Sequence, residues 1–231
     1  MNKAQRGGRK RPILVIGNKN YSSWSLRPWL VLRKGGVDFE EQRIALDQPD
    51  TAAKIARYSG AGRVPVLVDG TLVVWDSLAI CEYAAERWPG VPGWPRQREP
   101  RALARAAVCE MHSGFTDLRQ ELPMNCRGHR RGVVPSPRAA ADIARIQWIW
   151  AQCRTQHDGS GPWLFGNFGI IDAMFAPVAL RFETYGVELD ATAAAYVATV
   201  CGESAVQEWV AAGRGEPEVL ADEERGIPVV A

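Results

Sequence analysis

The sequence predicts an α/β domain followed by an all-helical domain within 231 residues. Three observations predict this division. Short β-rich runs alternate with helical segments up to residue 88, in the order β-α-β-α-β-β-α. The segment 89–100 then holds four prolines and two glycines in twelve residues, which cannot continue a helix or a central strand. Beyond it, apolar residues recur at steps of three and four, as they do along the buried face of a helix.

The distribution of charge distinguishes the two ends of the chain from its body. The first eleven residues carry five basic residues and no acidic one, so we expect a disordered basic leader. The last eighteen carry two arginines and five acidic residues, and the body between these ends is neutral, which argues against nucleic-acid binding. The expected parts are a basic leader (1–11), the α/β domain (12–88), a linker (89–100), the helical domain (101–212) and a C-terminal tail (213–231).

Composition excludes several classes of protein. Hydrophobic residues make up 46% of the chain and charged residues 23%, which is ordinary for a globular protein. No apolar run approaches the roughly 18 residues that span a bilayer, and the apolar stretch after the leader is too short for a signal peptide. The five cysteines include no C-x-x-C pair, and no two histidines have ligand spacing, so no metal site is expected. We expect a cytoplasmic protein with reduced thiols and no membrane partner.

The α/β domain begins with a strand, a helix and a second strand. Residues 12–16 are apolar and β-branched, which predicts the first strand. A helix is expected at 25–34, ended by Gly35-Gly36. Residues 38–46 are expected to form the second strand.

A hairpin and a helix close this domain. Asp69-Gly70 separates two β-rich runs within residues 66–75, which is the strongest short pattern for a hairpin. Residues 77–88 are expected to be helical, with Ser77 as the N-cap because a serine hydroxyl accepts a hydrogen bond from the first free amides.

The second domain shows only helical patterns. The same apolar spacing predicts one helix across 108–122 and another across 143–153, packed side by side. Residues 170–180 are apolar on nearly every side, which predicts a central buried helix. Two shorter helices are expected near 191–201 and 204–212.

A serine-rich loop separates the first strand from the first helix. With Ser25 as N-cap, Pro28 falls in the first helical turn, where its missing N–H costs little. The free amides and the positive end of the helix dipole would then point at Ser22 and Ser23. An anion or thiolate placed there would be stabilised by the dipole and by hydroxyl donors. The alternative is that these serines only cap a helix.

Two further segments carry candidate binding residues. Arg63-Val64-Pro65 precedes the hairpin, and a cis bond before Pro65 would expose the Val64 backbone to pair with a peptide. Asp76-Ser77 follows the hairpin. Its carboxylate could bind an ammonium group, while the hydroxyl and the helix N-terminus could bind a carboxylate. Taken alone, this pair is equally typical of a plain helix cap.

Together these segments resemble the glutathione S-transferase family over about residues 12–212. The first domain resembles the family's thioredoxin-like domain, and the second its all-helical C-terminal domain. Ser-Ser-Trp-Ser-Leu-Arg is similar to the serine signature of the zeta and tau classes, Arg-Val-Pro-Val-Leu to the family's cis-proline segment, and Asp-Ser to its glutathione motif. The pattern Gly-Ile-Ile-Asp-Ala-Met-Phe-Ala-Pro-Val at 169–178 resembles the family's helix-6 folding motif.

The resemblance implies a catalytic role for Ser22. This serine would donate its O–H to the sulfur of glutathione, the co-substrate, and hold it as thiolate, with Ser23 as the next candidate. A free thiol has a pKa of about 8.5 and is mostly protonated at neutral pH. The thiolate would then attack a small-molecule electrophile.

The resemblance also implies how glutathione is bound. Val64 would pair its backbone with the cysteinyl part, and Pro65 would hold the cis bend. Asp76 and Ser77 would bind the γ-glutamyl end, and Arg63 the glycyl carboxylate.

Two positions depart from the family's patterns. Zeta enzymes carry a cysteine two places after the catalytic serine, where this chain has Trp24, and this weakens a maleylacetoacetate-isomerase interpretation. The helix-6 motif begins with Gly169 in place of serine or threonine. Glycine caps nearly as well, so Asp172 should keep its buried structural role.

In this family the second substrate binds between the domains, so position nominates four substrate-binding residues: His112, Phe115, Arg119 and Arg181. Each has a plainer alternative. Phe115 lies on the apolar stripe and would be core, His112 would be a solvated surface histidine, and the two arginines would form surface salt bridges. The segment 122–127, which would end that helix, is also expected along the cleft.

The resemblance therefore implies a homodimeric, cytoplasmic glutathione transferase that acts in detoxification. Two alternatives remain open. One is a non-catalytic protein of the same fold that binds or scaffolds partners, and the other is a glutathione-dependent isomerase of the maleylacetoacetate type. A glutaredoxin-like oxidoreductase would need a cysteine at the start of the first helix, and residues 21–30 contain none.

Overall fold

The computed structural model describes residues 10–129, 132–155 and 161–226. Most of the basic leader and the end of the tail lie outside these residues, so the expectation of a disordered leader is not addressed. No helix within the described part of the chain is long and apolar enough to cross a membrane.

The N-terminal half is built on a four-stranded mixed sheet. Its strands are β1 (Ile13–Ile16), β2 (Glu40–Arg43), β3 (Val66–Asp69) and β4 (Leu72–Trp75), in the spatial order β2-β1-β3-β4. β1 runs parallel to β2 and antiparallel to β3. Asp69 and Leu72 pair across the tight turn, as the hairpin pattern predicts. β2 is shorter than expected because only the four residues that face β1 are paired.

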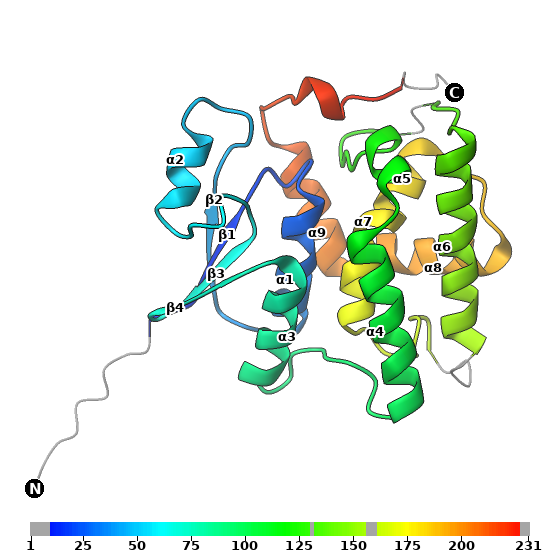
Figure 1. The fold of residues 1–231 in the computed structure, drawn as a ribbon, viewed down its shortest axis with the longest axis horizontal. Helices are drawn as coiled ribbons and strands as arrows, with labels where there is room; N and C mark the ends of the chain where they lie inside the picture. The colour runs from blue at the N-terminus through cyan, green and yellow to red at the C-terminus, as the bar shows by residue number, and fades with distance from the viewer. Residues whose placement is uncertain (1–9, 130–131, 156–160, 227–231) are drawn as a thin grey trace, which may run out of the picture.

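Helices cover both faces of this sheet. The helices α1 (Ser23–Lys34) and α3 (Ser77–Arg87) pack on one face, and α2 (Thr51–Ala56) lies on the other (Figure 1). Leu14 and Ile16 join the core beneath α1 and α3, whereas Val15 joins the small cluster beneath α2 with Ile55. This alternation is the period of two of a strand buried on both faces. The predicted order β-α-β-α-β-β-α is confirmed.

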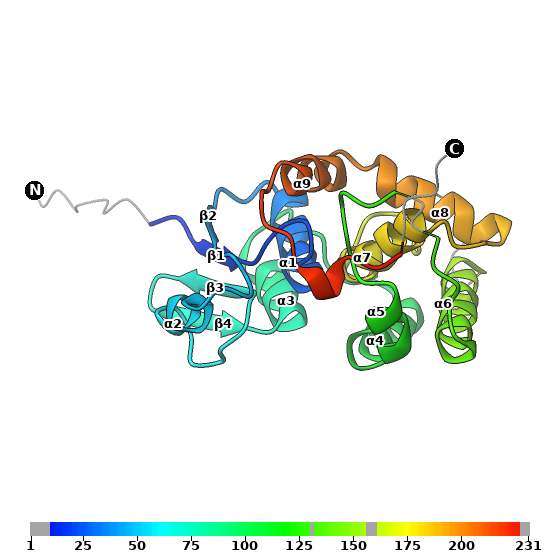
Figure 2. The ribbon, with the colours of Figure 1, turned by 90° about the horizontal axis from the view of Figure 1, so that it is seen from above.

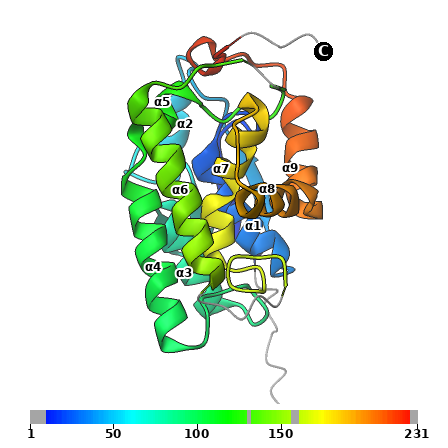
Figure 3. The ribbon, with the colours of Figure 1, turned by 90° about the vertical axis from the view of Figure 1, so that its right-hand side faces the viewer.

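The C-terminal half is helical. Its elements are α4 (Arg98–Ser113), α5 (Thr116–Glu121), α6 (Pro137–Thr155), α7 (Ile170–Tyr185), α8 (Ala191–Gly202), α9 (Ser204–Arg214) and the short 3-10 helix η1 (Ala221–Glu223). α7 is buried along almost its whole length and packs against α1, α4 and α8, which confirms the central helix (Figure 3). The predicted fold class, a thioredoxin-like domain followed by a helical domain, is confirmed.

The helix predicted across 108–122 is interrupted. α4 ends at Ser113, Gly114 is extended, and Phe115 takes the left-handed conformation with φ 57° before α5 begins. The spacing of apolar residues continues across this break, which is why periodicity alone predicted one helix. The break turns α5 so that the Leu118 amide donates to the Asp142 carboxylate of α6, at 3.1 Å.

Three helices also begin earlier or are capped differently than predicted. α1 starts at Ser23 with Ser22 as its N-cap residue, in place of Ser25. α3 is capped by Asp76 and not by Ser77. α4 starts at Arg98, within the segment expected to be linker. The helix tolerates Pro100 because this proline lies in the first turn, where no helical N–H is needed.

Asp172 holds the start of α7 as the helix-6 resemblance implies. Its carboxylate accepts hydrogen bonds from Gly169 N at 2.9 Å, Leu164 N at 3.2 Å and the Tyr196 hydroxyl at 3.0 Å. Asp172 is fully buried, and this burial raises its pKa to about 7, although the hydrogen bonds act in the opposite direction. The carboxylate therefore joins α7, α8 and the preceding loop at one buried point.

Candidate functional site

The loop between β1 and α1 is tightly packed around Gly17. A Cβ added at Gly17 would lie 2.8 Å from Leu46 Cδ1 and 3.1 Å from Ser22 Cβ, so a larger residue would displace the Leu46 side chain. The Gly17 amide donates to Ser25 Oγ at 3.1 Å. The Tyr21 and Ser22 amides both donate to the Asn18 carbonyl, which folds the loop into a tight turn. Ser22 and Ser23 are thereby held at the N-terminus of α1.

The hydroxyl of Ser22 does not cap the helix. Ser22 occupies the N-cap position, but its side chain makes no capping hydrogen bond. Its Oγ lies instead 2.7 Å from Ser25 Oγ. Because Ser25 Oγ already accepts from the Gly17 amide, Ser25 can donate its own proton to Ser22 and leave the Ser22 proton free for another acceptor. The interpretation of Ser22 as a mere side-chain cap is therefore wrong.

Hydrogen bonds from the C-terminal half of the chain hold this loop in place. The Glu216 carboxylate accepts from Lys19 N at 2.8 Å and from Asn20 N at 3.1 Å, and the Trp209 indole donates to the Lys19 carbonyl at 2.8 Å. The side chain of Asn20 donates to Asn125 Oδ1 at 3.1 Å. Sequence reasoning missed these anchors, because a polar residue some 200 positions away in a tail gives no local pattern.

The segment 122–127 helps to anchor the serine loop. Leu122, Met124, Asn125 and Cys126 are buried, and the Cys126 amide donates to the Asn20 carbonyl at 3.1 Å. We expected this segment along the cleft, but none of its residues lines either pocket, and its buried residues support the serine loop.

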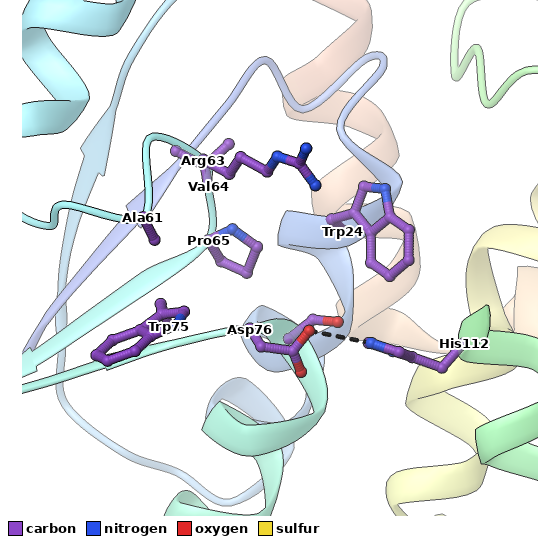
Figure 4. A pocket seen from close by; sticks show the side chains of 9 residues that line it. Trp24, Ala61, Arg63, Val64, Pro65, Trp75, Asp76 and His112 are labelled. Atoms are coloured by element: carbon purple, nitrogen blue, oxygen red, sulfur yellow. Dashed lines mark ion pairs between the residues drawn. The ribbon is translucent and has the colours of Figure 1, made fainter.

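A pocket of about 550 Å³ opens between the sheet and α4. Its lining residues are Trp24, Ala61, Arg63, Val64, Pro65, Trp75, Asp76, Ser77 and His112. The Val64–Pro65 peptide bond is cis. Figure 4 shows Pro65 beside Asp76, Arg63 reaching toward Trp24, and His112 facing Asp76 from the helical half.

Asp76, at the N-terminus of α3, caps the helix, contacts His112 and has an unusual backbone conformation. Its Oδ1 accepts from Leu78 N at 2.9 Å and from Ala79 N at 3.2 Å, so the carboxylate caps the helix. Its Oδ2 lies 3.0 Å from His112 Nε2. Its backbone has φ 76°, which costs a non-glycine residue on the order of 1–3 kcal/mol and is typical of functional sites. His112 therefore has an acidic partner and is only part-exposed, so its interpretation as a solvated surface histidine is wrong.

A second pocket of about 450 Å³ holds the serines. It is lined by Tyr21, Ser22, Ser23, Trp24, Leu46, Asp47, Thr51, Ile55, Gly62, Arg63, Val64, Arg119, Arg181, Leu220 and Glu223. Trp24, Arg63 and Val64 line both pockets, so the two form one continuous groove. Figure 2 shows η1, which carries Glu223, lying between α1 and α5 at the serine end.

Of the four nominated substrate-binding residues, three line the groove. His112 lines the first pocket, and Arg119 and Arg181 line the second. Arg181 is buried and Arg119 part-buried, so neither is the surface salt-bridge former considered above. Phe115 is buried in the main core and lines neither pocket, as its alternative as a core residue predicts.

Comparison with known proteins identifies the N-terminal half of the chain. Residues 21–87 match the family model of the glutathione S-transferase N-terminal domain. The chain is 33% identical over 109 residues to a probable maleylacetoacetate isomerase of Caenorhabditis elegans, covering 47% of this chain and 50% of that protein. It is 32% identical over 105 residues to glutathione S-transferase 1 of Dianthus caryophyllus, covering 45% and 48%. These alignments span about half the length of each relative.

A solved structure extends the likeness to the whole fold. A glutathione transferase homolog from Burkholderia, with bound glutathione, superposes with a TM-score of 0.66 at 24% identity and covers 90% of this chain and 100% of its own. The architecture is therefore that of the glutathione transferases. Residues 21–87 are therefore a glutathione S-transferase N-terminal domain, in a chain whose whole fold is that of these structures.

Proposed function

We propose that this protein is a glutathione transferase that holds the glutathione sulfur as a thiolate through Ser22. The observation that carries the proposal is the Ser22 hydroxyl, which sits at the N-terminus of α1 without capping it and lines the groove. Its neighbour Ser23 lines the same pocket and is the second candidate donor. Titration of glutathione into the protein tests the proposal, as described at the end of the Discussion.

The rest of the groove supports binding of the tripeptide. Glutathione carries an ammonium and a carboxylate at its γ-glutamyl end, a thiol in the middle and a carboxylate at its glycyl end. Asp76 supplies a negative charge, and Ser77 with the α3 N-terminus supplies donors, in the first pocket. Val64 supplies backbone beside the cis bond, and Arg63 supplies a positive charge where the two pockets meet. The donor set therefore fits glutathione.

The residues at the serine end account for activation of the thiol. A hydroxyl hydrogen bond together with a helix N-terminus can lower a thiol pKa by about one to two units. Ser25 adds to this, because a hydroxyl that accepts a hydrogen bond becomes a stronger donor itself. In this arrangement the Gly17 N–H donates to Ser25 Oγ and Ser25 donates to Ser22 Oγ, so that the Ser22 proton would be donated to the sulfur.

The thiolate would add to an electrophilic small molecule held in the second pocket. Isomerisation of the maleylacetoacetate type is a second candidate, favoured by the similarity to the Caenorhabditis elegans protein named as such an isomerase. A protein that only scaffolds partners has no use for the combination of Ser22, cis Pro65 and Asp76. Cytoplasmic location, a role in detoxification and a homodimer are part of the same proposal.

Replacing Asp76 by asparagine should weaken glutathione binding by about 10-fold or more, because the side chain loses the charge that faces the ammonium. The asparagine oxygen can still accept from the Leu78 amide, so the cap of α3 and the melting temperature should change little. Calorimetric titration measures the affinity. Asp190→Asn, at the N-cap of α8, is the matched control and should bind glutathione as the native protein does. Unchanged affinity of Asp76→Asn would remove Asp76 from the site.

Replacing Ser25 by alanine should raise the pKa of bound glutathione by a few tenths of a unit to about one unit, because Ser22 loses its hydrogen-bond donor. The Gly17 amide also loses its acceptor, which should lower the free energy of unfolding by about 1–2 kcal/mol. The pH dependence of the rate separates the two effects, since a purely structural role would lower stability without moving the acid limb of the profile. An unmoved acid limb would show that Ser25 does not position Ser22.

A further inference from the structure

Three arginines from three helices meet behind the serine end of the groove. Arg27 lies on α1, Arg119 on α5 and Arg181 on α7. Arg27 is fully buried and Arg181 is 4% exposed. Burial lowers the pKa of Arg27 well below its ordinary value, and the positive charges of Arg119 and Arg181 lower it further, so the three guanidinium groups act on one another. An arginine stays cationic at neutral pH nonetheless.

These arginines are poorly satisfied. Within the described part of the chain, Arg27 Nε, Arg119 Nη1 and both Nε and Nη1 of Arg181 are buried without a hydrogen-bond partner. The remaining donors of Arg27 and Arg119 go largely to neutral groups, including Ser77 Oγ, Met111 Sδ and the carbonyls of Met111 and Gly114. Carboxylates of the described residues act on these arginines only without a hydrogen bond: Asp76 on Arg27, Asp142 on Arg119 and Glu223 on Arg181. Buried cations that are incompletely paired are destabilising, which indicates that the arrangement serves a ligand.

Trp24 connects this cluster to the groove. The Arg27 guanidinium lies 4.0 Å from the Trp24 ring centre and that of Arg119 lies 5.0 Å from it. Trp24, Arg119, Arg181 and both serines line the same pocket of about 450 Å³. The acidic residues of that pocket are Asp47 and Glu223. Glu223, on η1, lies near enough to interact with Arg181, and its burial raises its own pKa.

We propose that Arg119 and Arg181, backed by Arg27, form a binding subsite for a carboxylate group of the second substrate. The inference rests on the proposed function and adds the chemical class of the electrophile: a compound whose reactive carbon stands a few bonds from an anionic group. The carboxylate would compensate the positive charge of the Arg119 and Arg181 guanidinium groups that line the pocket, and the reactive carbon would face the sulfur held by Ser22. In the absence of substrate, the Glu223 carboxylate supplies part of the compensating charge.

Glutathione itself does not explain the cluster. Of the donors that fit its carboxylates, Ser77 lines the first pocket and Arg63 lines both, whereas Arg181 lines only the second. Arg181 should therefore affect the second substrate and leave glutathione binding intact.

A matched pair of electrophiles tests the subsite. 4-Oxo-4-phenyl-2-butenoate carries a carboxylate, and its methyl ester is neutral. In both, addition forms a carbon–sulfur bond and breaks the carbon–carbon π bond, and the resulting enolate takes a proton from water. Relative to the uncatalysed reaction with glutathione, Arg181→Gln should lower kcat/KM for the acid by about 10-fold or more and for the ester by less than about 2-fold. Arg145→Gln, an exposed arginine paired with Glu110, should change neither.

The outcomes separate this inference from the proposed function. Equal losses for acid and ester, or no loss for the acid, would overturn the subsite while leaving the transferase standing. If the native protein turned over neither compound, the transferase proposal would be in question, and the subsite would be decided by thermal unfolding with benzylsuccinate, an unreactive dicarboxylate. Benzylsuccinate should raise the melting temperature of the native protein and of Arg145→Gln, but not that of Arg181→Gln. An equal rise in all three proteins, or no rise in the native protein, would contradict the subsite.

Folding of the variant is not expected to limit these tests. Removal of a buried cation with two unpartnered nitrogens should leave the melting temperature of unliganded Arg181→Gln equal to or above that of the native protein. A marked fall would show that Arg181 has a structural role, and this too would count against the subsite. Arg181→Lys, which keeps the charge but loses the planar donor pair, should recover part of the activity toward the acid.

Discussion

Replacement of Ser22 by alanine should lower the turnover rate by about 10- to 100-fold near pH 6.5, because the thiol of bound glutathione loses the hydroxyl that stabilises its anion. The glutathione dissociation constant should change little, since most of the contacts proposed for the tripeptide lie in the first pocket. As the pH rises above the pKa of free thiol, about 8.5, the two proteins should converge in rate. Measurement of the rate across this pH range, with glutathione saturating, gives the shift of the acid limb.

Matched variants make this result interpretable. Ser113→Ala removes an exposed hydroxyl that bonds only to the Cys109 carbonyl of its own helix, and should leave the pH profile unchanged. Ser23→Ala reports on the second candidate in the same pocket. A full native rate in Ser22→Ala with a loss in Ser23→Ala would reassign the donor to Ser23. A full rate in both would leave the backbone amides of α1 as the source of activation.

Replacement of Asp172 by alanine should lower the free energy of unfolding by about 3–5 kcal/mol. The change removes the acceptor of two backbone amides and of the Tyr196 hydroxyl, all of them buried, and leaves a cavity in the core. Urea unfolding at equilibrium measures the loss.

Asp190→Ala is the control for this prediction. It also removes an N-cap carboxylate, which accepts a hydrogen bond from the Ala193 amide at 2.8 Å, but Asp190 is exposed and its side chain accepts from this one amide only among the described residues. It should cost about 1 kcal/mol. Equal losses in the two variants would mean that Asp172 is only a helix cap and not the junction of α7, α8 and the preceding loop.

The stability of the native protein should also depend on pH through Asp172. Its folded-state pKa of about 7 lies above that of an unfolded aspartate, about 3.9, so the folded protein binds more protons between these values. The contribution of this group to stability is therefore fully present below about pH 4 and is lost as the pH rises toward 7. Asp172→Asn should remove this component of the pH dependence.

Local patterns were sufficient to predict most of the fold. Asp69-Gly70 between β-rich runs predicts a hairpin because few other sequences suit that turn, and the uniformly apolar residues 170–180 predict a helix buried on all sides. The break at Phe115 could not be predicted, since apolar spacing is the same on both sides of it. The early start of α4 was hidden by Pro100, which is unfavourable in a helix except in the first turn.

Some residues of the site could be predicted from local motifs, and others could not. Ser22, Pro65 and Asp76 stand in short motifs, so a single sequence was enough to nominate them. The Ser25 partner of Ser22 depends on the close approach at Gly17, which only the folded loop shows. The arginine cluster draws on three helices, and Glu216 reaches the serine loop from the C-terminal segment. Such long-range assemblies leave no local pattern in the sequence.

The most direct test of the central claim is calorimetric titration of glutathione into the purified protein, followed from about pH 5 to 9 by the ultraviolet absorbance of the thiolate. We expect binding, with an ionisation midpoint of the bound thiol about one to two units below the value of about 8.5 for a free thiol. The same titration of Ser22→Ala should show similar affinity and a midpoint near that of free glutathione. Absence of binding at millimolar glutathione, or a midpoint equal to that of the free thiol in the native protein, would contradict the account and favour a non-catalytic member of the family.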